Sequence, residues 1–365
     1  MPPQSANIHN HEFCPSGNPV PEIQFSGVSP ALRIIDVRSP GEFTEDHIPG
    51  ARNVPLLDDE ERKVTGTLYR VEGNESATRW ALRRLNQRLH AFREQLMTQI
   101  PEQSEPVICC ARGGDRSAHV VQFLIQSGQP AKQLHGGYRS FRKSVLRQLE
   151  RCDLAQLWIL DGYTGVGKTD VLRQVALRYP DRVIDLELYA GHRSSILGDL
   201  GLVPTSQKQF ESMLAAALTR VDEGAPWILI EGESRKVGNR QIPAALWQKM
   251  GAAPRIELIA SMEQRVRWLV DEYDTGDGWK QLHERVDRLR SYSQLGDDRV
   301  DHVQRCLEQG DPQSAARCLL EYHYDPRYQH GDEKNFQIRL ENHGASLACE
   351  ALVEQLELTT ENPQE

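Results

Sequence analysis

The sequence predicts an α/β protein built from two consecutive domains, the second a doubly wound parallel sheet with a helical C-terminal part. Apolar runs, glycine-rich turns and helical patterns follow one another in the strand–loop–helix order of α/β units. A chain of 365 residues exceeds the usual size of one hydrophobic core, which favours about two or three domains. Hydrophobic residues make up 39% of the chain and 27 residues are glycine, as in globular proteins.

Charge, cysteine content and hydropathy exclude several classes of protein. The 52 acidic and 43 basic residues give a net charge of −9, which excludes a uniformly basic nucleic-acid-binding surface but not a local basic patch. Seven cysteines are too sparse for a secreted disulfide framework and indicate thiols in a reducing compartment. The chain has no apolar run of about 18 residues and no export signal, so we expect a cytoplasmic protein without a membrane partner.

The first domain is predicted over residues 29–151, after an arm over residues 1–28 that shows no periodicity. Short apolar runs bounded by turn residues indicate strands, and apolar residues three and four apart indicate helices. Strands are predicted over residues 32–37, 53–55, 106–109 and 133–134, and helices over residues 79–96, 118–126 and 140–151.

The polar face of the predicted helix over residues 79–96 is rich in arginine. It carries Arg79, Arg83, Arg84, Arg88 and Arg93. This face is either a solvated surface or a patch that binds phosphate backbones.

The second domain is predicted over residues 152–325, and residues 326–365 form a C-terminal segment without an assigned role. Alternation of strands and helices predicts the parallel sheet, and the later helices form the helical part. Strands are predicted over residues 157–160, 182–186, 227–230 and 255–260, and helices over residues 169–178, 206–221, 262–273, 279–295, 301–309 and 312–322.

Residues 162–169 read GYTGVGKT and lie between a predicted strand and a predicted helix. Backbone N–H groups of such a loop converge on phosphate oxygens, and the helix N-terminus adds its dipole. Lys168 is expected to reach the terminal phosphate and Thr169 to hold Mg²⁺. The phosphate-binding residues predicted from this motif are Gly162, Thr164, Gly165, Gly167, Lys168 and Thr169.

Polar residues are expected at the carboxyl ends of the strands, where open α/β sheets bind ligands. Glu231 ends a predicted strand and is the candidate acid on the metal side, with Glu233 as the competing candidate. Two polar clusters are candidate substrate contacts, with a solvated loop as the alternative for each. They are His192 and Arg193, and Ser234, Arg235 and Lys236.

A second loop begins at Cys110, directly after a predicted strand, and reads CARGGDRS. Its two glycines allow the backbone amides to form an anion-binding nest, with Arg112 and Arg116 as further anion ligands. Such a nest stabilises a thiolate, so Cys110 is the candidate nucleophile, whereas Cys109 is expected to point into the core. Asp115 adds a negative charge, which opposes anion binding.

The motifs DVRSPGEF at residues 36–43 and HIPGA at residues 47–51, followed by the cysteine loop, resemble the rhodanese domain. We expect Asp36, Arg38 and Glu42 of the first motif to hold the cysteine loop in place. Together with the GYTGVGKT loop, the ordered motifs DDEER, GTLY, CARGG, GGY, DLE, HR and ESRK resemble those of the tRNA 2-selenouridine synthases. This resemblance covers about residues 32–325.

The resemblance implies a transferase that acts in two stages on the wobble 2-thiouridine of tRNA. Geranyl diphosphate first alkylates the sulfur, and selenophosphate then replaces the S-geranyl group with selenium. The glycine loop over residues 162–169 would hold the diphosphate, and Cys110 with Arg112 and Arg116 would handle selenium and phosphate. Residues 192–193 and 234–236 would contact substrate or tRNA, and a selenophosphate-producing enzyme would be a partner.

Two other functions fit the same residues. One is a kinase or NTPase with a regulatory rhodanese domain, which rapid ATP turnover without tRNA would favour. The other is a cysteine phosphatase, because the spacing from Cys110 to Arg116 also suits a nucleophile that attacks phosphate esters.

Overall fold

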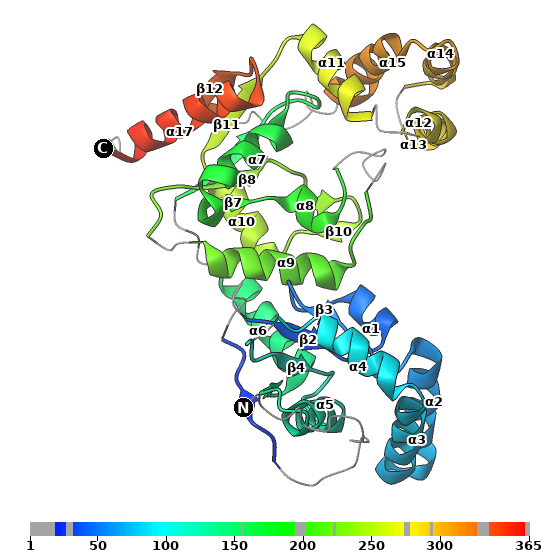
Figure 1. Cartoon of the computed structure of the whole chain (residues 1–365). Helices are drawn as coiled ribbons and strands as arrows, with labels where there is room; N and C mark the ends of the chain where they lie inside the picture. The colour runs from blue at the N-terminus through cyan, green and yellow to red at the C-terminus, as the bar shows by residue number, and fades with distance from the viewer. Residues whose placement is uncertain are drawn as a thin grey trace, which may run out of the picture. The chain divides into compact units, whose positions relative to one another are not determined.

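The computed structural model describes residues 19–26, 32–101, 103–152, 154, 156–193, 202–221, 224–273, 278–292, 295–326 and 336–361. The chain separates into two compact units. The N-terminal unit runs to Arg147 and takes in Glu211–Ala216, and the C-terminal unit holds the rest (Figure 1). Within the described ranges, no helix is long and apolar enough to cross a membrane.

The described part of the N-terminal unit contains a five-stranded parallel sheet in the order β1-β5-β4-β2-β3. Its strands are β1 (Glu22–Ile23), β2 (Ile34–Asp36), β3 (Arg52–Asn53), β4 (Val107–Cys109) and β5 (Lys132–Leu134). Asp36 and Cys109 are register partners at the ends of neighbouring central strands, so the loop that begins at Cys110 leaves from the middle of the sheet. β1 comes from the predicted arm, of which residues 1–18 and 27–28 lie outside the described ranges.

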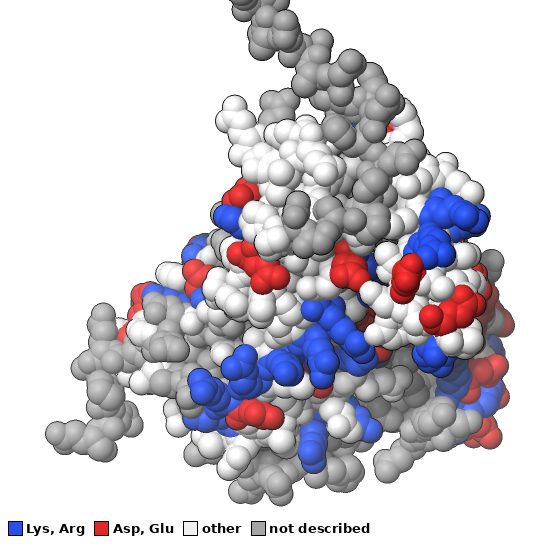
Figure 2. Space-filling model, turned by 90° about the horizontal axis from the view of Figure 1, so that it is seen from below, with Lys and Arg blue, Asp and Glu red and all other residues white. Residues whose placement is uncertain are grey.

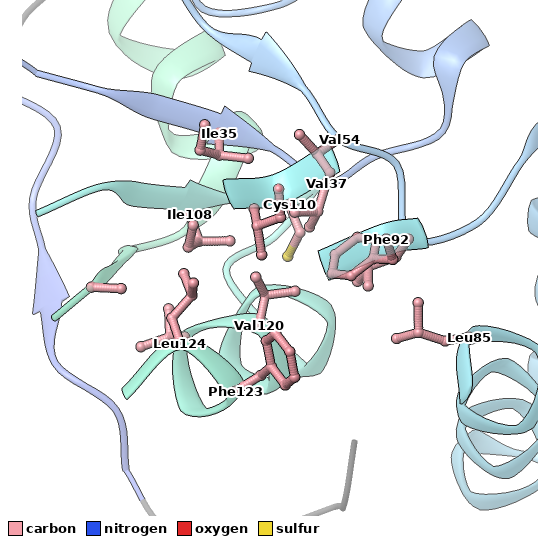
Figure 3. Close-up of a cluster of buried hydrophobic side chains, with 14 of the residues drawn as sticks. Ile35, Val37, Val54, Leu85, Phe92, Ile108, Cys110, Val120, Phe123 and Leu124 are labelled. Atoms are coloured by element: carbon pink, nitrogen blue, oxygen red, sulfur yellow. The ribbon is translucent and has the colours of Figure 1, made fainter. Parts of the chain in front are cut away.

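The core of this unit lies between the sheet and helices α4 (Leu89–Thr98) and α5 (Asp115–Gln126). Ile35, Ile108 and Val120 are among its fully buried residues (Figure 3). Helix α1 (Pro40–Glu45) begins at Pro40 with a capping box on Ser39, and α6 (Gly137–Arg151) follows β5.

The prediction of a single helix over residues 79–96 is wrong, because the helix is interrupted at Arg88 and forms two helices, α3 (Asn74–Gln87) and α4. The Arg88 guanidinium donates 2.7 Å hydrogen bonds to Leu56 O and Glu61 Oε2, contacts that a sequence pattern does not contain. Glu61 belongs to α2 (Asp59–Glu72), an unpredicted helix that begins with a capping box on Asp58 and lies beside α3 (Figure 1).

The arginine face of α3 is largely ion-paired. Arg84 and Arg88 bind the buried carboxylate of Glu61 at 3.3 and 2.7 Å, and Arg79 binds Glu75 at 2.5 Å. For these three arginines the structure favours the interpretation as a solvated, structural face.

The described part of the C-terminal unit contains a second five-stranded parallel sheet, in the order β12-β11-β6-β8-β7. Its strands are β6 (Leu157–Asp161), β7 (Val183–Ile184), β8 (Ile228–Glu231), β11 (Arg255–Ile259) and β12 (Phe336–Glu341). The predicted α/β fold class is therefore confirmed. β7 is shorter than predicted because Asp185 caps α8 (Leu186–Ala190) by accepting a hydrogen bond from Leu188 N.

Helices α7 (Lys168–Arg178) and α17 (Ala345–Glu361) pack together against this sheet. Residues of the C-terminal segment therefore build the unit: β12 extends the sheet beside β11, and α17 buries Leu352 and Leu356. Other elements include α9 (Gln207–Arg220), α10 (Ala244–Ala252) and the hairpin of β9 (Lys236–Val237) and β10 (Arg240–Gln241).

The helical part shares its own apolar cluster, which includes Leu269, Val286 and Val303. The helix predicted over residues 279–295 is divided in the structure, and the last helix continues into a π-helical turn over Leu320–Tyr324. The helices are α11 (Met262–Tyr273), α12 (Gly278–Val286), α13 (Leu289–Tyr292), α14 (Asp297–Glu308) and α15 (Pro312–Leu319).

Candidate functional site

The cysteine loop runs from Cys110 at the end of β4 to Asp115 at the start of α5. The loop between β5 and α6 packs directly against it. Tyr138 N donates a 2.9 Å hydrogen bond to Cys110 O, and Arg139 N donates a 3.1 Å hydrogen bond to Ala111 O. A Cβ atom on Gly137 would lie under 3.0 Å from Cys110 O, so this close approach requires glycine.

The Cys110 thiol has a hydroxyl partner that the sequence interpretation missed. Ser117 Oγ, in the first turn of α5, donates a 3.0 Å hydrogen bond to Cys110 Sγ. Gln133 Nε2 donates to Ser117 Oγ at 2.7 Å and to Gly114 O at 3.0 Å. Because a hydroxyl donor stabilises a thiolate, Ser117 adds to what the loop can do chemically. Its position directly after Arg116 is the signal that could have found it.

Cys110 itself is 2% exposed and belongs to the apolar cluster of the N-terminal unit. Figure 3 shows its sulfur directed toward Val120 of α5. In this conformation the thiol therefore offers little surface to a reactant. Cys109 is fully buried, as predicted, and burial, together with the nearby Asp36, raises the pKa of its thiol well above the ordinary value.

Arg116 is held by an acid rather than pointing free into the loop. Its Nη1 lies 3.2 Å from Glu42 Oε2, and Arg62 Nε lies 3.3 Å from the same oxygen. Burial raises the pKa of Glu42, but Arg116 and Arg62 lower it, so the net pKa lies below the ordinary value. An anion that binds Arg116 must compete with Glu42, whereas Arg112 is exposed.

Of the residues expected to hold the loop, Asp36 and Arg38 act through Tyr138, whereas Glu42 binds Arg116. Arg38 pairs with Asp36 at 2.7 Å, both buried, and its guanidinium lies 4.0 Å from the centre of the Tyr138 ring. The Tyr138 hydroxyl donates a 2.6 Å hydrogen bond to Asp46 Oδ2. With its ring fixed in this way, the tyrosine positions the backbone N–H that binds Cys110 O. Asp115 is the exposed first residue of α5, where the helix dipole favours an acid.

The predicted phosphate-binding loop lies between β6 and α7, and two side chains from later in the chain bind its carbonyl groups. Arg265 Nε donates a 2.9 Å hydrogen bond to Thr164 O, and Asn342 Nδ2 donates a 2.8 Å hydrogen bond to Val166 O. Arg265 is in turn fixed by Asp325 at 2.5 Å. These contacts fix the conformation of the loop, and sequence reasoning identified none of the three residues.

Lys168 and Thr169 begin α7. Lys168 Nζ donates hydrogen bonds to Gly162 O at 2.8 Å and to Tyr163 O at 3.3 Å, so the ammonium group lies back on the loop. Thr169 Oγ1 donates a 3.0 Å hydrogen bond to Glu187 Oε2. Glu187, in the DLE motif of the sequence, is thus the carboxylate bound to Thr169, rather than Glu231 or Glu233.

Glu231 lies one contact further away. Its Oε2 accepts a 3.1 Å hydrogen bond from Glu187 N, and its side chain is buried. Burial raises the pKa of Glu231 well above the ordinary value, and the carboxylates of Glu187, Asp185 and Glu233 raise it further. Burial likewise raises the pKa of Asp185. Glu233, half-buried, stands two residues beyond Glu231.

The oxygen groups around Thr169 suit a magnesium ion. Mg²⁺ is usually bound by one or two carboxylates, substrate phosphates and water, and Thr169 with Glu187 would supply one hydroxyl and one carboxylate. The described residues contain no group of three His, Cys, Asp or Glu side chains placed to hold a metal by themselves. Phosphate oxygens would therefore have to complete such a site.

His192, from the first predicted polar cluster, lies against the β9–β10 hairpin, whose first residue, Lys236, belongs to the second cluster. A Cβ atom on Gly238 of its turn would lie 2.7 Å from the His192 ring, whose buried Nδ1 has no hydrogen-bond partner among the described residues. Arg193 forms an ion pair with Glu272 of α11. Ser234 Oγ donates a 2.7 Å hydrogen bond to Lys236 O, and the side chains of Arg235 and Lys236 are exposed.

The fold and its two loops define a class: a two-domain α/β protein that joins a rhodanese-like cysteine loop to a P-loop domain. Family comparison agrees with this class. The family model described as "tRNA 2-selenouridine synthase AAA domain" matches residues 155–358, and that of the rhodanese-like domain matches residues 26–144. The chain belongs to the tRNA 2-selenouridine synthase family, a family of enzymes.

Relatives described as tRNA 2-selenouridine synthases extend this similarity over most of the chain. The protein from Chromohalobacter salexigens is 32% identical over 83% of this chain and 88% of its own length. That from Hahella chejuensis is 33% identical over 82% of this chain and 86% of its own length.

One solved structure, the N-terminal domain of a Clostridium difficile protein, is 35% identical over 32% of this chain and 90% of its own length. Its TM-score is 0.31.

Proposed function

We propose that the protein converts wobble 2-thiouridine of tRNA to 2-selenouridine, by S-geranylation with geranyl diphosphate and replacement of the S-geranyl group using selenophosphate. One observation carries this proposal. In a chain that aligns with family relatives over more than four-fifths of its length, specific side chains bind both glycine loops: Ser117 binds Cys110, and Asn342 binds Val166. Each stage of the proposed reaction uses a phosphorylated donor, and we assign one donor to each loop.

We assign geranylation to the P-loop. The uridine sulfur attacks the first carbon of the geranyl group, a C–S bond forms, the C–O bond breaks and diphosphate leaves. Loop N–H groups and Lys168 would neutralise charge on the leaving diphosphate, once the ammonium group exchanges Gly162 O for a phosphate oxygen. Thr169 and Glu187 would hold Mg²⁺, which when bound supplies further positive charge to the diphosphate.

We assign selenium delivery to the cysteine loop. Arg112, Arg116 and the loop amides would hold the phosphate group of selenophosphate beside Cys110. Selenium of selenophosphate then bonds to C2 of the base, the C–S bond breaks and geranyl thiol leaves. Water attacks the phosphorus, the Se–P bond breaks and phosphate leaves. Ser117 would stabilise the Cys110 thiolate through its 3.0 Å hydrogen bond.

The proposal also includes a supply of selenophosphate. Another enzyme must make this donor, and a cytoplasmic site would give access to it and to tRNA. The exposed Arg235 and Lys236, near His192, would contact tRNA or substrate.

The test is an incubation of the full chain with 2-thiouridine tRNA, geranyl diphosphate and selenophosphate, followed by mass spectrometry of the nucleosides. We expect Lys168→Ala to lose geranylation, whereas Lys249→Ala, which removes an exposed lysine of α10, retains it. We expect Cys110→Ala to keep geranylation and lose selenium insertion, with Cys109→Ala as the matched thiol control.

Absence of any modified nucleoside with the unmutated protein would refute the proposal. Rapid ATP hydrolysis without tRNA would favour the kinase or NTPase function instead. Cys110-dependent hydrolysis of phosphate esters would favour the phosphatase function.

A further inference from the structure

Helix α6 carries a basic stripe that its own packing does not use. Arg139, Lys143 and Arg147 recur every four residues, so they lie on one face of the helix, and all three are exposed. The same spacing reaches Arg151 at the helix end. The opposite face is apolar and buries Phe141, Val145 and Leu149.

The stripe lacks acidic partners among the residues that the structure describes. The one side-chain hydrogen bond found for its members joins Arg147 Nε to Lys143 O within the helix, at 3.4 Å. By contrast, Arg142 on another face of α6 approaches Asp46 to 3.9 Å. Like charges four residues apart destabilise a helix by roughly 0.2–0.5 kcal/mol per pair, so the stripe opposes folding slightly.

Some other exposed basic residues of the same unit are held by acidic partners. Lys63 binds Glu60 and Lys132 binds Glu105, each at 2.6 Å, and Arg79 binds Glu75 at 2.5 Å. On a chain of net charge −9, three basic side chains without an acidic partner on one face of one helix form a local concentration of positive charge. Figure 2 shows that Lys and Arg side chains are not spread evenly over the surface but gather in places.

The stripe begins at the cysteine loop. Arg139 N donates its 3.1 Å hydrogen bond to Ala111 O, directly after Cys110, and the exposed Arg112 follows in the same loop. Four residues of helix rise by about 6 Å, which is comparable with the distance between successive phosphates along an RNA strand. Spacing, charge and position thus all fit a polyanion that passes the cysteine loop.

We propose that the face of α6 formed by Arg139, Lys143 and Arg147 binds the sugar–phosphate backbone of RNA beside the cysteine loop. The choice of RNA over another polyanion rests on the proposed function. The expected salt dependence does not rest on that function, because each phosphate neutralised by a basic side chain releases a counterion and steepens the salt dependence of binding. Binding is measurable with tRNA alone, without either donor.

The experiment compares two triple variants of the full chain that remove the same charge. The stripe variant is Arg139→Gln, Lys143→Gln and Arg147→Gln. The control variant, Lys63→Gln, Arg79→Gln and Lys132→Gln, removes three exposed but ion-paired residues of the same unit. The association constant for tRNA is measured by fluorescence anisotropy over a series of salt concentrations, with circular dichroism and thermal melting as checks of folding.

We expect the stripe variant to bind tRNA about tenfold or more weakly at low salt. Its slope of log K against log salt concentration should be less steep by about 2–3, from roughly 0.7–0.9 per lost phosphate contact. We expect the control variant to change affinity less than about twofold. Equal changes in both variants, or no change in either, would overturn the proposal.

A second polyanion separates RNA from other partners. If the stripe variant loses binding to heparin but keeps that to tRNA, the face serves another polyanion and the proposal is wrong. A changed salt slope in a protein that forms no 2-selenouridine would support the RNA surface and refute the proposed function. Formation of 2-selenouridine with an unchanged slope in the stripe variant would support the proposed function and refute the RNA surface.

Discussion

Replacement of Gly137 by alanine tests whether the second glycine loop positions Cys110. Gly137 has φ of 56°, where an alanine costs about 1–2 kcal/mol. The added Cβ would lie 2.5 Å from Gly113 N and closer still to Cys110 O, and neither backbone atom can rotate away. Overpacking of this kind costs about 1–3 kcal/mol. We therefore expect Gly137→Ala to destabilise the N-terminal unit by about 2–5 kcal/mol and to displace the cysteine loop.

Gly128→Ala is the matched control. Gly128 has φ of 82°, but a Cβ added there would meet no atom within 4 Å, so only the backbone cost of about 1–2 kcal/mol applies. Calorimetry should show a melting temperature lower for Gly137→Ala than for Gly128→Ala by at least about 2 °C, given roughly 2–4 °C per kcal/mol. Selenium insertion should fall in Gly137→Ala alone, with geranylation retained in both.

Equal melting temperatures and equal selenium insertion in the two variants would refute the reasoning. They would mean that the hydrogen bond from Tyr138 N to Cys110 O survives a Cβ atom at the contact. The cysteine loop would then not depend on the second loop for its position.

Three further predictions concern side chains around the two loops. Glu42→Gln should lower the free energy of unfolding by about 1 kcal/mol at pH 7. The lowered pKa of Glu42 stabilises the fold above about pH 4.3, and this stabilisation is lost as pH falls through the native pKa. Urea titrations at several pH values measure the difference in stability. Asn342→Ala should leave Val166 O without its partner, cost about 1–3 kcal/mol and reduce geranylation, but not selenium insertion into pre-geranylated tRNA. Glu231→Gln should stabilise the protein at pH 8 and have little effect near pH 4, as measured by melting temperature, because a carboxyl of raised pKa loses native-state stability as pH rises.

Each of these predictions has an opposing result. A pH-independent deficit in Glu42→Gln would show that its ion pair with Arg116 contributes nothing. Loss of selenium insertion from pre-geranylated tRNA in Asn342→Ala would contradict a role confined to the P-loop. Lower stability of Glu231→Gln at pH 8 would show that the buried carboxylate is well compensated.

The sequence alone predicts the α/β class and the position of both loops, because these depend on local patterns. A strand followed by a glycine turn and a helix needs only apolar periodicity and residues that accept unusual φ values. The buried Cys109 followed from the same local pattern, since a strand-end residue next to the loop faces the core.

What completes each site comes from contacts between distant residues. Arg116 finds Glu42 at a separation of 74 residues, and the P-loop carbonyl of Val166 finds Asn342 at a separation of 176. The same holds for the helix break at Arg88, which follows a hydrogen bond to Glu61. Strand order and the closing of long loops decide which of many polar side chains meet, and no local propensity contains that information. The chain therefore specifies its loops by itself, whereas only the tertiary structure decides which residues hold them.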